Sequence, residues 1–185
     1  MSTAPGIEET ALEGVVIVRP PRFADSRGYF SETWNRAAFA ATGIDVDFVQ
    51  DNHSASVLKG TVRGLHAQAP PFAQAKLVRC VRGEILDVAV DIRRGSPSFG
   101  KSVTVRLSAE NGAQLFIPPG FLHGFVTLSD GCEVLYKCSA PYARDAEIAA
   151  RFDTAGIDWG IDPAEAILSA KDDAAPPLSA LRSPF

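Results

Sequence analysis

Residues 85–93 read ILDVAVDIR, and this stretch decides the fold. Its side chains alternate in character along an extended chain, with apolar ones on one face and charged ones on the other: Leu86, Val88, Val90 and Ile92 against Asp87, Asp91 and Arg93. A period of two residues is the signature of a half-buried strand. This stretch therefore predicts a β-strand.

The flanking residues extend the pattern into a series of strands. Residues 76–82, KLVRCVR, run into Gly83 and predict the first arm of a hairpin with 85–93. After a turn at 94–100, residues 101–107 alternate again, and we expect Val103, Val105 and Leu107 to point inward. Two further strands, at 114–117 and 132–138, follow turns. The sequence thus predicts an all-β sandwich or barrel closed from two sheets.

Helical signals are few and short. Residues 33–43, TWNRAAFAATG, predict about two helical turns that end at Gly43 by a glycine cap. Residues 163–172, PAEAILSAKD, predict a turn or a short helix. We predict one domain over residues 1–185, with a core of about 14–172 and a C-terminal tail, 173–185, that lies on the surface.

Composition excludes several classes of function. The net charge is −4 and the pI about 5.4, with no dense run of Lys and Arg, which argues against nucleic acid as a partner. The N-terminus lacks the pattern of a signal peptide, and no apolar run has the length of a membrane span. Three cysteines without a CxxC pair indicate reduced thiols and a cytoplasmic protein.

The histidines do not show the spacing of a metal site. The chain has only His53, His66 and His123, and no two of them form a His-x-His pair. We therefore predict a protein without metal and without a cofactor.

The most polar short stretch is 63–78, RGLHAQAPPFAQAKLV, which places His66 between Arg63 and Lys76. A lone histidine in a strand is most often a structural residue with a satisfied hydrogen bond. The cations around His66 favour a second interpretation, a site that binds an anion and moves a proton, because histidine accepts a proton near neutral pH.

His123 and Tyr136 likewise fit either a structural or a catalytic role. His123 follows a Pro-Pro-Gly turn and fits either a barrel-rim residue or a fixed catalytic imidazole. Tyr136 shares a strand face with Val134 and Cys138, and this face is predicted to point inward. An inward tyrosine is usually a packing residue with a paired hydroxyl, but its phenol is also a competent proton donor. The stretches FADSRGYFSETW (23–34) and FVQDNHSAS (48–56) suggest, taken alone, a turn with an edge strand and a polar loop.

Taken together and in order, these stretches resemble one family closely. The motifs are DSRGYFSETW (25–34), QDNHSAS (50–56), RGLHAQ (63–68), QAKLV (74–78), the long run from Gly83 to Gly100, PPGFLHGF (118–125), LYKC (135–138) and LSAKD (168–172). They are similar to those of the dTDP-4-dehydrorhamnose 3,5-epimerases. That family consists of metal-independent cupins, which act in deoxysugar biosynthesis. The resemblance runs from about Gly14 to Asp172.

The resemblance implies a fold and a set of roles. The fold would be a double-stranded β-helix, or jelly roll, in a homodimer formed by strand exchange at the N-terminus. His66 would be the general base, Asp172 its carboxylate partner and Tyr136 the general acid. The residues that hold the nucleotide sugar would be Arg27, Glu32, Gln50, Asn52, Arg63, Lys76, His123, Tyr142, Glu147 and Lys171, with Tyr142 stacked on the thymine. The chain departs from the family pattern at Ala67 and Pro141, where an aromatic residue is common.

The resemblance also implies the reaction. The substrate would be dTDP-4-dehydro-6-deoxy-D-glucose, whose carbons 3 and 5 are inverted through an enolate to give dTDP-4-dehydro-L-rhamnose. The oxyanion of the enolate would be stabilised by His123 or Lys76. The alternative within the same chemistry is a single-centre 3- or 5-epimerase, or a keto isomerase, of a related nucleotide-linked 4-keto-6-deoxysugar. A cupin that only binds a sugar nucleotide would need no acid–base pair, and a metal-dependent cupin dioxygenase lacks its ligands here.

Overall fold

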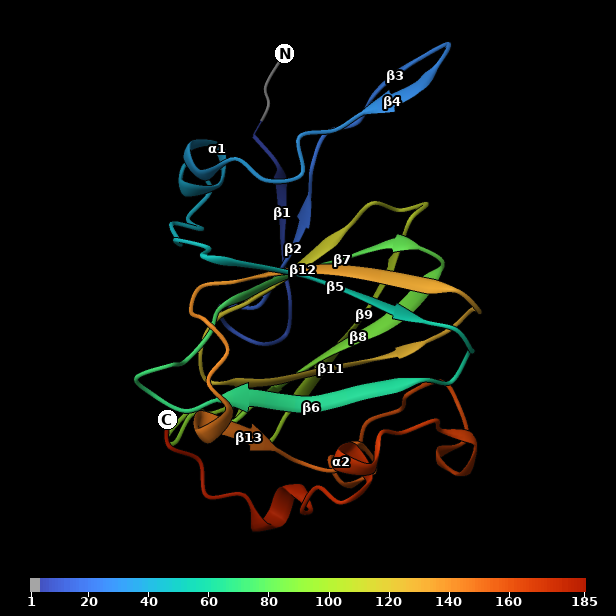
Figure 1. The fold of residues 1–185 in the computed structure, drawn as a ribbon. Coiled ribbons are helices and arrows are strands. Elements are labelled where there is room, and N and C mark those ends of the chain that lie inside the picture. Colours follow the sequence, from blue (N-terminus) through green and yellow to red (C-terminus); the bar gives the residue numbers. More distant parts are fainter. Residues whose placement is uncertain (1–3) are drawn as a thin grey trace.

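Two antiparallel sheets face each other in the computed structural model, which describes residues 4–185 (Figure 1). The first sheet has six strands, in the order β1 (Gly6–Glu9), β2 (Val16–Arg19), β10 (Gln114–Ile117), β7 (Lys76–Arg82), β12 (Cys132–Cys138) and β5 (Gln50–Ser56). The second has five, in the order β13 (Glu147–Ala149), β6 (Val62–Gln68), β11 (Phe121–Thr127), β8 (Glu84–Asp91) and β9 (Ser102–Ser108). A separate hairpin, β3 (Phe23–Asp25) and β4 (Gly28–Phe30), projects from the body. The arrangement confirms the predicted all-β jelly roll.

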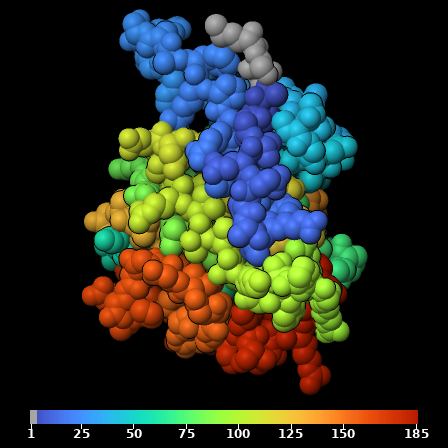
Figure 2. All heavy atoms as spheres, turned by 180° about the vertical axis from the view of Figure 1, so that it is seen from behind, coloured from blue at the N-terminus to red at the C-terminus, as the bar shows by residue number. Residues whose placement is uncertain are grey.

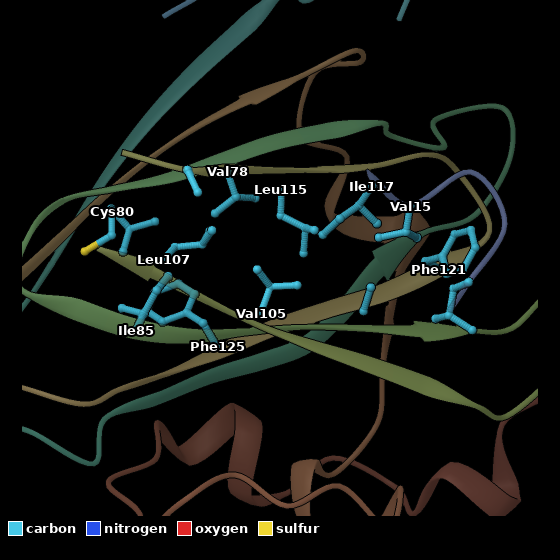
Figure 3. Packing of buried hydrophobic residues seen from close by; sticks show 14 of the residues in the cluster. Val15, Val78, Cys80, Ile85, Val105, Leu107, Leu115, Ile117, Phe121 and Phe125 are labelled. Atoms are coloured by element: carbon cyan, nitrogen blue, oxygen red, sulfur yellow. The ribbon is translucent and has the colours of Figure 1, made fainter. Parts of the chain in front are cut away.

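The core between the two sheets comes from the inward positions of their strands. Figure 3 shows Val78 and Leu115 of the six-stranded sheet facing Val105 and Leu107 of the five-stranded one. Val105 and Leu107 point inward as predicted, and each of these four side chains is at most 8% exposed. Full burial of such a side chain stabilises the fold by about 1.5–3 kcal/mol.

The predicted hairpin of 76–82 with 85–93 is wrong. β7 pairs with β10 and β12, whereas β8 pairs with β11 and β9, so the chain changes sheets at Gly83. Gly83 has a φ of +76°, and a Cβ there would lie 2.6 Å from Ser129 Oγ. The turn chemistry was recognised in the sequence, but a sharp corner between sheets looks the same as a hairpin turn when only the local residues are considered.

Both faces of β8 are buried, including the one that carries aspartates. Its apolar face packs with Leu65 and Leu122 in a second cluster outside the five-stranded sheet. The other face contributes Ile85 to the core between the sheets, and Asp87 and Asp91 on the same face are fully buried. The alternation of 85–93 is thus confirmed, and its charged face is directed into the molecule.

The helical elements are short. α1 (Arg36–Ala40) starts at Asn35, whose side chain accepts a hydrogen bond from the Ala38 N–H, and it makes little more than one turn before Gly43. The remaining ones are α2 (Ala170–Asp173) and the 3-10 turns η1 (Arg144–Ala146), η2 (Phe152–Thr154), η3 (Pro163–Glu165) and η4 (Leu178–Ala180). No helix in residues 4–185 is long and apolar enough to span a membrane.

The C-terminal segment covers the outer face of the five-stranded sheet. Phe152 and Trp159 are buried there with Leu65, and the tail adds Leu181 and Phe185. The tail is also held by backbone contacts, because the Arg94 N–H donates to Phe185 O at 2.9 Å. Figure 2 shows these orange and red residues at one end of the molecule. The C-terminal segment is therefore a docked layer, and α2 within it lies against β6.

Candidate active site

A pocket of about 450 Å³ is lined by side chains from both sheets and from the C-terminal segment. β6 and β11 contribute Arg63, His66 and His123, while β7 and β12 contribute Lys76 and Tyr136. The segment 167–172 closes one side. The volume lies in the range typical of small-molecule sites.

A second hollow of about 110 Å³ shares His66, Lys76 and Tyr136 with this pocket. Its other lining residues are mostly polar: Gln50, Asn52, Gln68, Gln74, Tyr142 and Glu147. Ala67, at one of the two departures from the family pattern, also lines it. The two hollows therefore adjoin at His66, Lys76 and Tyr136.

His66 and Asp172 form a hydrogen-bonded pair at the pocket wall. Nε2 of His66 lies 2.6 Å from Asp172 Oδ1, although the residues are 106 positions apart in the chain. Burial acts to raise the pKa of Asp172, but hydrogen bonds from His66 and Ser169 and the charge of His66 outweigh it, so this pKa lies below its ordinary value. A carboxylate beside Nε2 leaves Nδ1 of His66 as the nitrogen that can accept a proton.

Asp172 owes its position to the start of α2. Ser169 is the N-cap, and its Oγ accepts the Asp172 N–H at 3.1 Å. The carboxyl group is nearly buried, with a side chain 6% exposed against 28% for His66. The helix is only one turn long, so the cap and the contact with His66 are what orient the carboxylate.

Tyr136 faces the pocket from the other sheet. It packs against the core between the sheets, which confirms the predicted inward face. Burial raises the pKa of its phenol, while the nearby Arg63 lowers it to a smaller extent. A phenol with a raised pKa stays protonated at neutral pH and is available as a proton donor.

Lys76 presents a cation without a partner. Within residues 4–185 its ammonium group forms no hydrogen bond and no ion pair, although it lines both hollows. Burial lowers the pKa of Lys76, and the nearby acidic groups, among them Asp87 and Glu147, oppose that shift. The ammonium is thus placed to receive an oxygen atom of a ligand.

His123 lies directly opposite His66, on the neighbouring strand. Its Nε2 is 2.8 Å from Asp87 Oδ1, and both side chains are almost completely buried. Two glycines permit the close approach of the strands. A Cβ on Gly64 would lie 2.6 Å from His123 O, and one on Gly124 would lie 2.7 Å from Arg63 O.

A polar network surrounds the smaller hollow. Tyr142 OH donates to Glu147 Oε2 at 3.2 Å, and Lys171 forms an ion pair with the same carboxylate. Gln50 Oε1 accepts the Tyr142 N–H at 2.9 Å, and Gln50 Nε2 donates to Asn52 Oδ1 at 3.0 Å. The structure therefore brings these five predicted residues together on one side of the site. It also corrects the interpretation of 50–56 as a loop, because these residues form the edge strand β5, paired with β12.

Arg27 and Glu32 do not line either hollow. Arg27 lies in the turn of the β3–β4 hairpin, where its side chain is 88% exposed and pairs with Asp25 at 2.6 Å. Glu32 follows β4 on the same projecting segment (Figure 1). Within one copy of the chain, these two predicted residues are separate from the other eleven.

Sequence reasoning missed two residues of the site. Ser54 lines the main pocket, and its Oγ is buried without a hydrogen-bond partner. Asp87 lies behind His123 and was treated only as part of an alternating strand. An aspartate flanked by Leu86 and Val88 was a signal for it, because a charge within a strand buried on both faces needs a partner. No cluster of three or more His, Cys, Asp or Glu side chains in residues 4–185 is arranged to hold a metal ion.

Known proteins that match this chain are epimerases of nucleotide-linked sugars. The family model for dTDP-4-dehydrorhamnose 3,5-epimerase matches residues 9–180. The chain is similar to the dTDP-4-dehydrorhamnose 3,5-epimerase of Salmonella typhimurium, with 51% identity over 92% of this chain and 93% of that one.

Solved structures are similar over nearly the whole chain. A Legionella pneumophila dTDP-6-deoxy-D-glucose-3,5-epimerase in complex with dTDP-4-keto-L-rhamnose superposes with a TM-score of 0.91 and 41% identity, over 96% of this chain and 95% of that one. A 3'-monoepimerase of Streptomyces bikiniensis in complex with dTDP-quinovose gives a TM-score of 0.85 and 35% identity, over 92% of this chain and 86% of that one. One fold thus serves proteins that invert one or two centres.

Proposed function

Because this chain belongs to the dTDP-4-dehydrorhamnose 3,5-epimerase family, we propose that it is an isomerase that inverts carbons 3 and 5 of dTDP-4-dehydro-6-deoxy-D-glucose. The product is dTDP-4-dehydro-L-rhamnose, an intermediate of rhamnose biosynthesis. One observation carries the proposal: a His–Asp pair and a tyrosine enter the same pocket from opposite sheets.

The chemistry requires this arrangement. The keto group at carbon 4 acidifies the protons on carbons 3 and 5. Nδ1 of His66 takes one of them, and the electron pair moves to the carbonyl oxygen to form an enolate. Tyr136 then donates a proton to the same carbon from the opposite face, which inverts it. His66 ends with one proton more and Tyr136 with one fewer, so exchange with solvent restores both for the second centre.

Asp172 keeps His66 ready for this step. Its carboxylate accepts the Nε2–H and stabilises the imidazolium that forms when Nδ1 takes the proton. Arg63 and Lys76 are the cations for the diphosphate and the enolate oxygen, since both line the main pocket. Gln50, Asn52, Tyr142, Glu147 and Lys171 hold the nucleotide, with Tyr142 stacked on the thymine. The reaction is internal to the substrate and needs no cofactor.

The assembly is proposed to be a homodimer built through the N-terminal region. Arg27 and Glu32, assigned to the nucleotide by the family motif, lie outside the pocket of their own copy. Tyr29 and Phe30 are adjacent on the same hairpin and are 59% and 68% exposed, so this hairpin offers an apolar contact surface. A second copy that receives this hairpin would cover them and gain Arg27 for its own site. Sedimentation at micromolar concentration tests this, and a monomeric mass contradicts it.

The proposal also covers the domain organisation and the cellular compartment of the protein. We propose a single domain, 1–185, in which the docked tail belongs to the same folding unit as the core of about 14–172. The three cysteines are free and buried, in agreement with a reducing cytoplasm.

Turnover in heavy water tests the reaction. The protein is incubated with dTDP-4-dehydro-6-deoxy-D-glucose in D₂O, and the deuterium in the product is located by NMR. A 3,5-epimerase places deuterium at both carbons. Label at only one carbon after complete conversion identifies a single-centre enzyme, which the similarity to the 3'-monoepimerase makes the second candidate. No label at all contradicts the acid–base mechanism.

A further inference from the structure

Asp87 is a fully buried carboxylate for which the reaction above has no role. It lies on the inner face of β8, and its Oδ1 is 2.8 Å from Nε2 of His123. Its Oδ2 is one of two buried side-chain N or O atoms in residues 4–185 that have no hydrogen-bond partner; the other is Ser54 Oγ. Burying a carboxylate with one hydrogen bond is unfavourable, so its presence in the interior calls for a reason.

The contact determines where the proton of His123 lies. A carboxylate oxygen only accepts hydrogen bonds, so Nε2 of His123 must carry hydrogen to make this contact. Burial lowers the pKa of His123; Asp87 opposes that shift, whereas the charges of Lys76 and His66 add to it. The net direction is downward, which keeps the ring neutral at neutral pH. Nδ1 is then unprotonated.

In the part of the chain that the structure describes, the other ring nitrogen of His123 has no protein partner that would occupy it. His123 lines the main pocket, and its Nδ1 forms no hydrogen bond within residues 4–185. An unprotonated Nδ1 accepts a hydrogen bond and cannot donate one to an enolate oxygen. Lys76, whose ammonium is unpartnered in the same pocket, can donate one. The choice between His123 and Lys76 for the oxyanion is thereby decided in favour of Lys76.

We propose that Asp87 is a positioning residue that holds His123 as the Nε2–H tautomer, so that Nδ1 accepts a hydrogen bond from a hydroxyl group of the bound hexose while Lys76 donates to the enolate oxygen. This rests on the proposed function for the identity of the ligand. His123 thereby recognises a hydroxyl group of the sugar by a hydrogen bond. A dTDP ligand without the hexose does not form this bond.

Nitrogen-15 NMR of the imidazoles tests the tautomer without any substrate. The chain has three histidines, so His53→Gln and His66→Gln variants assign the signals. We expect a protonated Nε2 and an unprotonated Nδ1 for His123 at neutral pH. Protonation of Nδ1, alone or together with Nε2, overturns the proposal. The tautomer is measured on the wild-type protein, and variants serve only to assign the signals without changing Asp87 or His123.

Binding measurements test the consequence for the ligand. The probes are dTDP and dTDP-quinovose, which carries the hexose but lacks the reactive keto group. In Asp87→Asn the amide can present either its oxygen or its NH2 group to Nε2, so the variant no longer fixes the tautomer of His123. We therefore expect affinity for dTDP-quinovose to fall by about 3- to 10-fold and affinity for dTDP to stay within about twofold. Equal losses for both ligands, or no loss for either, contradict the proposal.

The matched control is Asp91→Asn, on the same face of β8. Asp91 is also fully buried, but it pairs with Arg93, Ser96 and Ser98 and does not contact His123. This variant should leave the His123 signals and the ratio of the two affinities unchanged. If wild-type protein binds neither probe, the proposed function fails, whereas the tautomer measured by NMR still decides the role of Asp87.

Discussion

Two histidine–aspartate pairs lie side by side in this molecule and are built differently. His66 and Asp172 are 2.6 Å apart, with side chains 28% and 6% exposed. His123 and Asp87 are 2.8 Å apart, with side chains 7% and 0% exposed. In both pairs Nε2 contacts the carboxylate, and the two histidines are register partners on neighbouring strands.

The two pairs differ in the element that carries the carboxylate and in the access of solvent to the imidazole ring. Asp172 comes from a one-turn helix laid against β6, whereas Asp87 comes from a central strand. A general base must exchange its proton with solvent between turnovers, and the partly exposed His66 can do so. His123 is enclosed between Asp87 and the pocket, which favours a fixed orientation over proton transfer. The same residue types thus serve chemistry in one pair and positioning in the other.

Removal of each imidazole ring in turn should give the largest difference between the two pairs. His66→Ala should lower turnover by about 10²- to 10⁴-fold, the usual contribution of a general base, and abolish exchange of the sugar's protons with solvent. His123→Ala should retain measurable exchange, because the base is intact. Both rates are followed by NMR in D₂O, with dTDP binding as a check that the pocket is formed. Loss of exchange in His123→Ala to the same degree would show that the two pairs have no such division of roles.

The next largest effect concerns the acid on the opposite face. Tyr136→Phe removes only the hydroxyl, so the enolate still forms at His66 but is not protonated from the other side. Epimerisation should fall by about 10²-fold or more, while exchange with retained configuration should persist. The ratio of deuterium in recovered substrate to deuterium in product measures this. A Tyr136→Phe variant that loses both processes equally would argue that the phenol supports the enolate step as well.

Binding can be separated from chemistry at Arg63. Arg63→Ala should weaken dTDP affinity by about 10- to 150-fold, the range for a lost hydrogen bond to a charged group. Lys76→Ala should slow exchange, because Lys76 faces the enolate oxygen, and it should weaken dTDP affinity less than Arg63→Ala does, because dTDP has no hexose. Calorimetry with dTDP gives the affinities. Arg106→Ala is the control, since Arg106 forms an exposed ion pair with Glu84 outside the pocket. Unchanged affinity in both pocket variants would mean that the diphosphate lies elsewhere.

The smallest effect is on stability and involves the His66–Asp172 pair alone. Hydrogen bonds from His66 and Ser169 place the folded-state pKa of Asp172 below its ordinary value of 3.8, against the effect of burial. A carboxyl group with a lowered pKa stabilises the fold above its unfolded pKa, and this contribution is lost as the pH falls through the folded pKa. Asp172→Asn should therefore reduce the decrease in melting temperature between about pH 5 and pH 3. Parallel melting curves for the two proteins across this range would contradict the assignment.

The sequence alone predicted the class of the fold and most of the site. The alternation of 85–93 and 101–107 required strands, because only an extended chain separates such residues onto two faces. The ordered motifs, through their resemblance to one family, named eleven residues that the structure gathers around one site, including the pair of His66 and Asp172 across 106 positions.

Only the tertiary structure decided which strands pair and which charges face inward. Gly83 turns the chain from one sheet to the other, and no local property distinguishes that corner from a hairpin, because the partners of β7 and β8 are distant in sequence. Asp87 is likewise one of several aspartates on alternating positions until β11 places His123 beside it. Local patterns determine secondary structure, whereas pairing and burial depend on contacts between residues far apart in the chain. The role of a buried charge therefore becomes visible only once the sheets have closed around it.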